Sequence, residues 1–439
     1  MFGKLKSKVL SAGRSEWTSE RGFVLATIAG AVGLGNIWRF PYIVGENGGG
    51  SFVLAYIVAI LLLGIPMMVL EISAGKTGHG SPVRTFRLLN KRAAPFGWFV
   101  VFLTTVIMSY YLAVTGWTLG YAVESFFGSI KTFADFTNSY MPLLYFLIVV
   151  VFTAYVVQRG VKAIEFLSKI LMPLLILIVL FLAVYSLTLK NAGEAISFLF
   201  TPEFSALSNI NVWILAFGQA FYSLSVGQGF LITYGSYLPS KINLPRAAGV
   251  VALVETSIAI LAGVIIFPIV FSFGLDPQEG TQLAFTTLPL VFNSFAFGKY
   301  LAIMFFTLFF LAAISSCIAG MEVIKTAVKE EFNFSSKKST FIAFLPIVPL
   351  GFLSALSFTP MGFKVFGRPF LEILDLFAAN QLVVASALIG GAIISWSFSK
   401  KDLAASFGTK WIKVSEFAIG VFRALPFVGA IILLLSFIL

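Results

Sequence analysis

The sequence predicts an all-α protein that crosses the membrane about eleven times. Of its 439 residues, 59% are hydrophobic and 11% are charged, and the mean hydropathy is +0.97. A soluble domain of this length could not bury so much apolar surface, so the composition predicts a polytopic membrane protein. The apolar stretches are continuous runs of Leu, Ile, Val and Phe, which favours helices over the alternating strands of a membrane barrel.

Eleven apolar segments are long enough to span a bilayer as helices, the fourth and the ninth being the shortest. They are residues 22–42, 50–73, 96–123, 141–157, 165–188, 212–237, 247–274, 298–327, 340–357, 370–397 and 416–438. Lysine and arginine concentrate in alternate loops between these segments. By the positive-inside rule, this pattern places the N terminus in the cytoplasm and, with eleven spans, the C terminus outside.

The composition also argues against several function classes. The net charge is +11, but the basic residues lie in short loops between apolar segments, so they indicate orientation rather than nucleic-acid binding. With one cysteine, Cys317, no intrachain disulfide framework is expected. The single histidine, His79, lies in a polar loop, and no metalloprotease or phosphate-loop motif is present, so we expect no enzyme.

The first apolar segment contains the most informative stretch of the chain. Gly30, Gly33 and Gly35 lie within six residues and make a poor helix interior. Asn36 and Arg39 follow directly. Unwound backbone is tolerated inside a membrane only where protein or a polar cavity covers it, so the stretch predicts a binding site at mid-depth. The alternative is close helix packing through small residues.

The sixth apolar segment has the same design. Within this segment, a glycine-interrupted motif extends from Gly218 to Gly229 and includes Gly227. The motif places Ser223 and Ser225 at mid-depth. Because the two interrupted segments are five apart, each would open a unit of five helices, and the second unit would enter the membrane from the opposite side. Paired broken segments in such inverted repeats point to a binding site at their interface.

Several motifs together resemble the neurotransmitter:sodium symporter family, including its bacterial amino-acid transporters. They are Gly33-Leu34-Gly35-Asn36-Ile37-Trp38-Arg39-Phe40-Pro41, Glu46-Asn47-Gly48-Gly49-Gly50, Gly64-Ile65-Pro66 leading to Glu71, Tyr110-Tyr111 with Trp117-Thr118-Leu119-Gly120, the sixth-segment motif through Tyr234-Gly235-Ser236-Tyr237, and Ser315-Ser316. The fold of that family consists of inverted repeats in which helices 1 and 6 are broken, which is the pattern described above.

The resemblance implies a sodium-coupled secondary active symporter that imports an amino acid by alternating access. It would lie in the lipid bilayer of the cell membrane, bind two sodium ions, bind no nucleic acid and require no oligomer. The expected parts are a cytoplasmic segment (1–21), a transporter core (22–397, helices 1–5 and 6–10 as repeats) and a cytoplasmic linker with helix 11 (398–439). A proton-coupled amino-acid transporter, a channel and a transporter-like nutrient sensor are the alternatives.

The family's sodium ligands carry over to named positions. The first ion would be bound by the Ala31 carbonyl and by the side chains of Asn36, Ser223 and Glu255. The second would be bound by the carbonyls of Ala29, Val32 and Ala312 and by the hydroxyls of Ser315 and Ser316. Neutral oxygens from broken helices suit a monovalent cation. The alternative for the two serines is a hydrogen bond back to their own helix.

The substrate site implied by the resemblance is lined by both broken helices, the third span and the eighth. Its expected residues are Ala31, Gly33, Gly35, Ile107, Tyr111, Tyr222, Ser225, Gln228, Ser316 and Gly320. The amides at the first break and the Tyr111 hydroxyl would bind the carboxylate, and carbonyls near Tyr222 and Ser225 the ammonium. At Gly33, amine transporters of the family carry an aspartate, so its absence favours an ordinary amino acid.

Two pairs of charges are expected to act as gates. Arg39 and Asp375 would pair across the outer vestibule, and Arg14 would reach Glu330 on the inner side. The alternative for each is a solvated surface charge.

One residue departs from the family pattern. Glu255 stands where an asparagine is expected, and Ala259, one helical turn later, stands where chloride-dependent members carry serine. The two positions share a helix face, so the Glu255 carboxylate would replace chloride, and transport is expected to be chloride-independent. The alternative is a protonated glutamate with a structural role.

Overall fold

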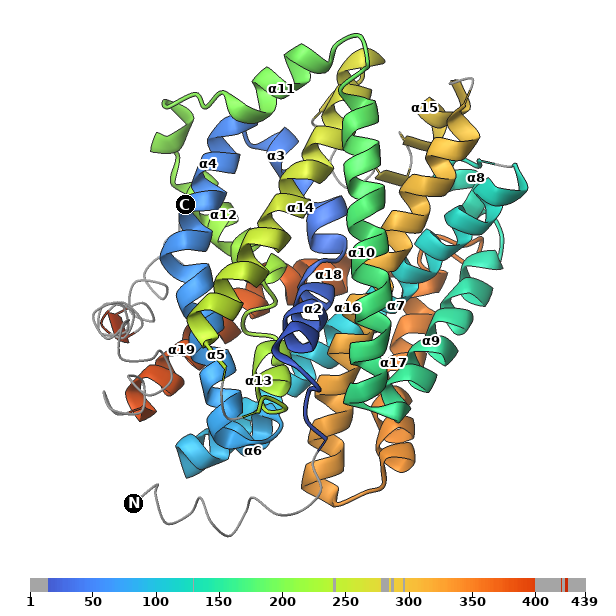
Figure 1. The fold of residues 1–439 in the computed structure, drawn as a ribbon. Coiled ribbons are helices and arrows are strands. Elements are labelled where there is room, and N and C mark those ends of the chain that lie inside the picture. Colours follow the sequence, from blue (N-terminus) through green and yellow to red (C-terminus); the bar gives the residue numbers. More distant parts are fainter. Residues whose placement is uncertain are drawn as a thin grey trace.

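The computed structural model describes residues 15–128, 130–239, 242–277, 284–285, 288–294 and 297–398, together with residues 420, 423 and 424. This part of the chain is almost entirely helical (Figure 1). Within it, eight helices are long and apolar enough to cross a membrane, and one bent helix pair would make a ninth. The predicted all-α membrane fold is therefore confirmed, while the predicted eleventh span lies almost entirely outside the described residues.

The elements follow the predicted order, with η denoting 3₁₀ or π-helical segments. They are α2 Glu20–Ala31, η1 Gly35–Arg39, α3 Phe40–Glu46, α4 Gly50–Ala59, η2 Ile60–Gly64, α5 Ile65–Gly78, α6 Pro82–Leu89, η3 Lys91–Ala93, α7 Ala94–Phe127, α8 Phe133–Thr137, α9 Met141–Arg159, α10 Val161–Ser186, α11 Ala192–Phe200, η4 Ala206–Ser208, α12 Ile210–Ser223, α13 Phe230–Gly235, α14 Leu244–Ser272, α15 Leu288–Ser294, α16 Gly298–Phe332, α17 Ser336–Leu356, β1 Lys364–Val365, β2 Arg368–Pro369, α18 Phe370–Asp375, η7 Leu376–Leu382 and α19 Val383–Ser397.

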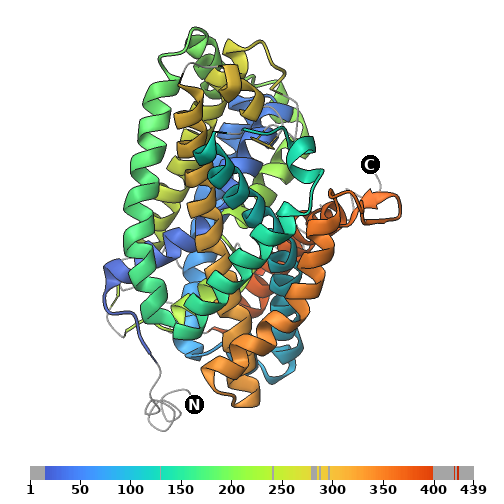
Figure 2. The ribbon, with the colours of Figure 1, turned by 90° about the vertical axis from the view of Figure 1, so that its right-hand side faces the viewer.

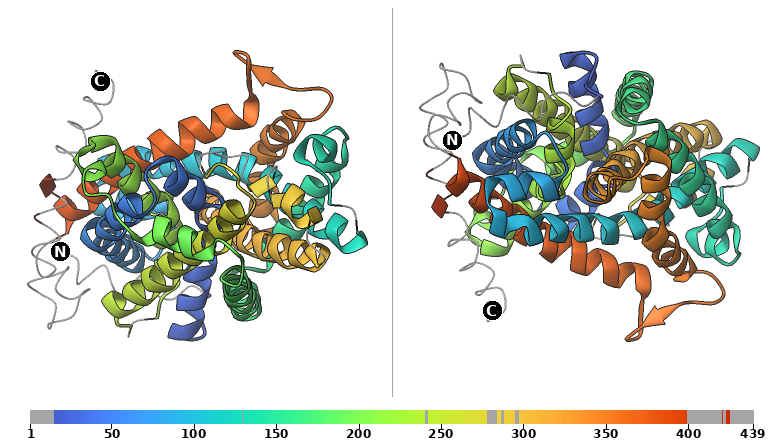
Figure 3. Two further views of the ribbon diagram at one scale, coloured as in Figure 1. Left: turned by 90° about the horizontal axis from the view of Figure 1, so that it is seen from above. Right: turned by 90° about the horizontal axis from the view of Figure 1, so that it is seen from below.

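The helices form one bundle in which α7 packs most extensively against α16. Figure 2 shows that α2 enters from the edge beside α10 and runs toward the interior, and that the β1–β2 hairpin projects from the opposite side. Views from above and below show the helices crossing at varied tilts (Figure 3). The basic helix α6 and the α16–α17 turn share one end of the bundle, whereas α8, α11 and α15 share the other (Figure 1).

Two spans are interrupted, and they are the two that the glycine pattern predicts. The pair formed by α2 and η1–α3 bends by 49°. The sixth span is divided into α12 and α13. The interruptions therefore fall five spans apart, as expected of two inverted five-helix repeats.

Small residues bring α13 into backbone contact with α5. A Cβ on Gly75 would lie 1.9 Å from the Ile232 carbonyl oxygen, and a Cβ on Gly235 would lie 2.5 Å from the Ile72 carbonyl oxygen. Lipid tails are as apolar as the side chains, so the hydrophobic effect does not drive membrane helices together. Their association depends instead on close packing through small residues. The short helix α13 is therefore held against the second span by reciprocal glycines.

We expect Gly75→Ala to lower the free energy of unfolding in detergent by about 1–3 kcal/mol, because the methyl group would force the two backbones apart. Gly249→Ala is the matched control, since nothing lies within 4 Å of its Cβ position on α14. The control should leave stability unchanged or raise it by up to about 1 kcal/mol. Thermal unfolding compares the two variants. Equal melting temperatures would contradict the backbone contact between α5 and α13.

Candidate functional site

The first break follows directly from the end of α2. Val32 is extended, with φ −74° and ψ 111°, and so ends the helix. The Gly33 amide donates to Asn36 Oδ1 at 3.0 Å, and the Leu34 amide donates to the Tyr111 hydroxyl at 2.8 Å. Side chains thus accept from the two amides that follow the end of α2, and Tyr111 lies at the break.

The second break lies between α12 and α13 and contains three residues with positive φ. Ser225 has φ 56°, Gly227 has φ 80° and Gly229 has φ 77°. Glycine adopts such angles readily, whereas serine rarely does. At Gly227 there is also no room for a side chain, since a Cβ would lie 2.6 Å from the Ala387 amide nitrogen. Gly227 therefore permits both the turn and the contact with α19.

Three neighbouring helices bind the backbone of this second break. The Gly227 amide donates to Glu71 Oε1 on α5 at 2.8 Å, and its carbonyl accepts from Ser386 on α19 at 2.6 Å. The Gln228 carbonyl accepts from the Thr104 hydroxyl on α7 at 2.7 Å. Irregular backbone at membrane depth requires such partners, because lipid supplies none.

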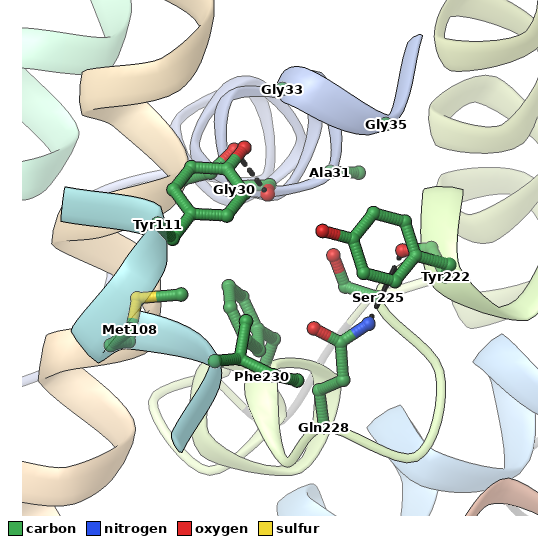
Figure 4. A pocket seen from close by; sticks show the side chains of 12 residues that line it. Gly30, Ala31, Gly33, Gly35, Met108, Tyr111, Tyr222, Ser225, Gln228 and Phe230 are labelled. Atoms are coloured by element: carbon green, nitrogen blue, oxygen red, sulfur yellow. Dashed lines mark hydrogen bonds between the residues drawn. The ribbon is translucent and has the colours of Figure 1, made fainter. Parts of the chain in front are cut away.

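A cavity lies between the two breaks (Figure 4). Its lining residues are Gly30, Ala31, Gly33, Gly35, Ile107, Met108, Tyr111, Tyr222, Ser225, Gln228, Phe230 and Ser316. All the predicted substrate residues except Gly320 are among them. The tertiary structure therefore brings together residues that were predicted from four separate spans.

Gly320 does not line the cavity, and Met108 explains why. A Cβ on Gly320 would lie 2.4 Å from Met108 Sδ, so the methionine fills the space that the glycine leaves. Met108 and Phe230 were not predicted to line the site. Met108 precedes Tyr111 by three residues and shares its helix face, and Phe230 directly follows the second break. The spacing of Met108 from Tyr111 and the position of Phe230 after the break could therefore have indicated both residues from the sequence.

The residues predicted for the first sodium ion form one hydrogen-bonded cluster around Glu255. Asn36 Nδ2 and the Ser223 hydroxyl both donate to Glu255 Oε1. Tyr56 donates to Ser223 at 3.1 Å and to Glu255 at 3.5 Å, and Thr256 donates to Oε2 at 3.3 Å. Ala31, the remaining predicted ligand, lines the adjacent cavity.

Glu255 is fully buried, and the described residues supply it with neutral donors only. It forms no ion pair with any lysine or arginine in this part of the chain. A buried carboxylate is costly unless a charge compensates it. Neutral donors alone do not compensate a full charge, so Glu255 is a position at which a cation or a proton would bind.

The residues predicted for the second sodium ion also meet, across α2 and α16. The Ser316 hydroxyl lies 3.0 Å from the Gly30 carbonyl oxygen and 3.2 Å from that of Val32. The Ser315 hydroxyl donates to the Ala312 carbonyl at 2.9 Å, which is the back-bonding alternative. Ala29 lies on the last turn of α2, next to these groups. Hydroxyls and free carbonyls thus converge without a charged side chain.

The residues predicted to form the outer gate both lie near Tyr222, which lines the cavity. Arg39 is 6% exposed, donates to Gln219 and lies over the Tyr222 ring, with 5.2 Å between Cζ and the ring centroid. Asp375 ends α18 and lies within electrostatic range of Arg39 and Tyr110. A direct pairing of Arg39 with Asp375 stays a prediction.

The predicted inner pair is only half described. Arg14 lies outside the described residues, and Glu330 accepts a hydrogen bond from the Ser81 amide at 2.7 Å, at the start of α6. The described N-terminal residues contact α13 and α10. Trp17 Nε1 donates to the Tyr234 carbonyl at 2.9 Å, and Thr18 donates to Glu165 on α10 through its amide and its hydroxyl.

A buried ion pair lies beside these attachments and was not predicted. Lys325 Nζ is 3.0 Å from Glu322 Oε2, and the two residues are 4% and 1% exposed. Tyr237 donates to Glu322 at 2.8 Å, and Lys325 donates to the Val157 carbonyl at the end of α9 at 3.1 Å. The pair connects α16 with α9 and with the chain after α13. The sequence could have indicated this ion pair, because it places two opposite charges three residues apart within an apolar segment.

Similarity to known proteins extends over nearly the whole chain. The sequence matches the sodium:neurotransmitter symporter family over residues 14–142 and 129–438. The chain belongs to the sodium:neurotransmitter symporter family.

Relatives and solved structures of the family agree with this assignment. The chain is 35% identical to "Uncharacterized sodium-dependent transporter YhdH" of Bacillus subtilis over 404 residues, covering 89% of each protein. It is 28% identical to sodium-dependent nutrient amino acid transporter 1 of Drosophila melanogaster over 474 residues, covering 89% of this chain and 72% of the relative. The crystal structure of MhsT in complex with L-phenylalanine matches with a TM-score of 0.88 and 37% identity, covering 96% of this chain and 99% of MhsT.

Family membership makes this chain a multi-pass membrane transporter rather than an enzyme. The buried Glu322–Lys325 pair lies beside the contacts of the N-terminal residues, since Tyr237 contacts both Glu322 and Trp17.

We expect Lys325→Met to lower the free energy of unfolding by about 3–5 kcal/mol, because it leaves Glu322 buried without its cation. The double variant with Glu322→Gln should recover part of this loss. Removing the partly exposed pair Arg87–Glu331 on the same side should cost at most about 1 kcal/mol. Melting temperatures in detergent measure the stability of all three variants. An equal loss of stability on disrupting either ion pair would contradict the larger contribution of the buried pair.

Proposed function

We propose that this chain imports an amino acid across the cell membrane by sodium-coupled alternating access, with no requirement for chloride. The observation that carries the proposal is the cluster around Glu255, which adjoins the cavity between the two helix breaks. A fully buried carboxyl group with neutral donors and no basic partner among the described residues is neutralised by a proton or by a bound cation, and we propose that sodium is that cation. A sodium ion bound there would link ion binding to the substrate site.

The substrate's end groups match the two breaks. A substrate carboxylate would replace Asn36 Oδ1 and the Tyr111 oxygen as acceptor of the amides at the first break, with the Tyr111 hydroxyl as a further donor. Carbonyls next to Tyr222 and Ser225 would bind an ammonium. A Cβ on Gly33 would lie 2.2 Å from the Tyr111 hydroxyl and 2.5 Å from Ser316 Oγ. An aspartate at Gly33 would not fit this arrangement, so the substrate supplies its own carboxylate.

Chloride independence follows from the position of Glu255. Ser223 and Tyr56 direct hydroxyls at this carboxylate, and Gln219 is engaged by Arg39 and by the Gly35 carbonyl. The two hydroxyls that could bind an anion are thus directed at the Glu255 carboxyl group, and the Gln219 amide already has other partners. Ala259, one turn along α14, offers no hydroxyl to a chloride ion.

Proteoliposomes loaded with potassium test the proposal directly. We expect uptake of a radiolabelled amino acid in sodium gluconate to equal that in sodium chloride, and to be absent in potassium gluconate. Glu255→Asn combined with Ala259→Ser should make uptake chloride-stimulated, because it replaces the fixed charge with an anion site. A wild-type requirement for chloride, or normal chloride-free uptake by Glu255→Gln, would refute the role of Glu255.

The second ion site is tested through Ser315. Ser315→Ala removes one neutral ligand, so we expect the sodium concentration for half-maximal substrate binding to rise several-fold. The melting temperature should change little, since the lost hydroxyl bonds only to its own helix. Binding measured against sodium in detergent gives the midpoint, and an unchanged midpoint would exclude Ser315 as a ligand. Ser354→Ala is a matched control, because that hydroxyl also back-bonds within its own helix, α17.

A further inference from the structure

The cavity between the breaks contains a hydrogen-bond acceptor, on Gln228, to which no described residue donates. Gln228 Nε2 donates to the Tyr222 carbonyl at 3.2 Å. Its other end, Oε1, receives no hydrogen bond from the described residues, and Figure 4 shows this oxygen directed toward the side of the cavity where Phe230 lies. A ligand that fills the cavity would separate this oxygen from water, and an unpaired buried oxygen is unfavourable, so a ligand that supplies the donor gains affinity.

The orientation of the Gln228 amide is set by the backbone of the second break. The Tyr222 carbonyl accepts from the Ser225 amide at 3.1 Å and from Gln228 Nε2 at 3.2 Å. Both of its lone pairs are therefore used, and the amide group of Gln228 turns its nitrogen toward Tyr222. The oxygen is the end that remains for a substrate.

The rest of this side of the cavity is uncharged. Ile107, Met108 and Phe230 form apolar walls, and Ser225 is another uncharged polar residue of the lining. No lysine, arginine, aspartate or glutamate is among the lining residues that the structure describes. A substrate side chain ending in a full charge would be buried without a counter-charge, which is costly. An uncharged donor next to an apolar body fits both features.

We propose that Gln228 makes the transporter selective for amino acids whose side chain carries an uncharged N–H donor, such as a carboxamide or an indole. The proposal rests on the proposed function and specifies its substrate class. Selectivity arises because an analogue lacking the N–H leaves Gln228 Oε1 desolvated and unpaired. Gln228 contacts the substrate side chain and acts as a specificity-determining residue.

Two matched pairs of amino acids test this in a sodium-dependent competition assay on the full chain. Tryptophan is compared with benzothienylalanine, in which sulfur replaces the indole N–H, and glutamine with 5-oxonorleucine, in which methyl replaces the amide nitrogen. In at least one pair, we expect the N–H compound to compete about tenfold better. The pair that shows the preference identifies an indole or a carboxamide.

Variants link the preference to Gln228. Gln228→Met removes the acceptor at similar size and should bring the ratio within each pair close to one. Met108→Leu changes the shape of the same cavity without touching an acceptor and should preserve the ratio. The wild-type comparison decides the matter even if the Gln228 variant fails to fold.

The outcomes distinguish the role of Gln228 from the proposed function on which it rests. Sodium-dependent competition with ratios near one in both wild-type pairs would overturn the role of Gln228 and leave amino-acid import standing. A preserved preference in folded Gln228→Met would likewise overturn it. If no amino acid competes in sodium, the proposed function fails and this inference fails with it.

Discussion

Unwound backbone inside an apolar medium needs hydrogen-bond partners, and this need shapes the whole centre of the molecule. Each break frees amides and carbonyls that lipid cannot bind, so neighbouring helices must supply partners. Glu71 and Ser386 do so at the second break, and Tyr111 and Ser316 do so at the first. The requirement draws polar side chains from several separate spans to the same depth. The cavity between the breaks is the consequence of that convergence.

The same constraint explains the charge at the centre of the molecule. Most groups around the cavity are neutral, which suits a cation that must bind and leave. Glu255 is a charged residue next to this region, fully buried with donors from Asn36, Ser223 and Tyr56 but no basic partner among the described residues. Under the proposed function, its carboxylate would favour a cation and disfavour chloride.

Contacts on the inner side share elements with this centre. Helix α16 carries Ser315 and Ser316 near its middle and the Glu322–Lys325 pair two turns further along. Helix α13 begins at Phe230 in the cavity wall and ends where Trp17 attaches. The cavity and the N-terminal contacts therefore share the helices α13 and α16. Under the proposed function, this arrangement would allow ion binding at the centre to affect those contacts.

Apolar length and clustered glycines are local properties, so the membrane class, the spans and the two breaks could be predicted from the chain alone. Most cavity residues could be named as well, through motifs that resemble the family. The packing of the helices was needed to show that Met108 fills the space beside Gly320 and that Ser223 and Asn36 point at Glu255. It was also needed to show that Lys325 binds both Glu322 and the end of α9. These contacts join residues distant in the chain or depend on side-chain direction, and neither follows from spacing along the sequence.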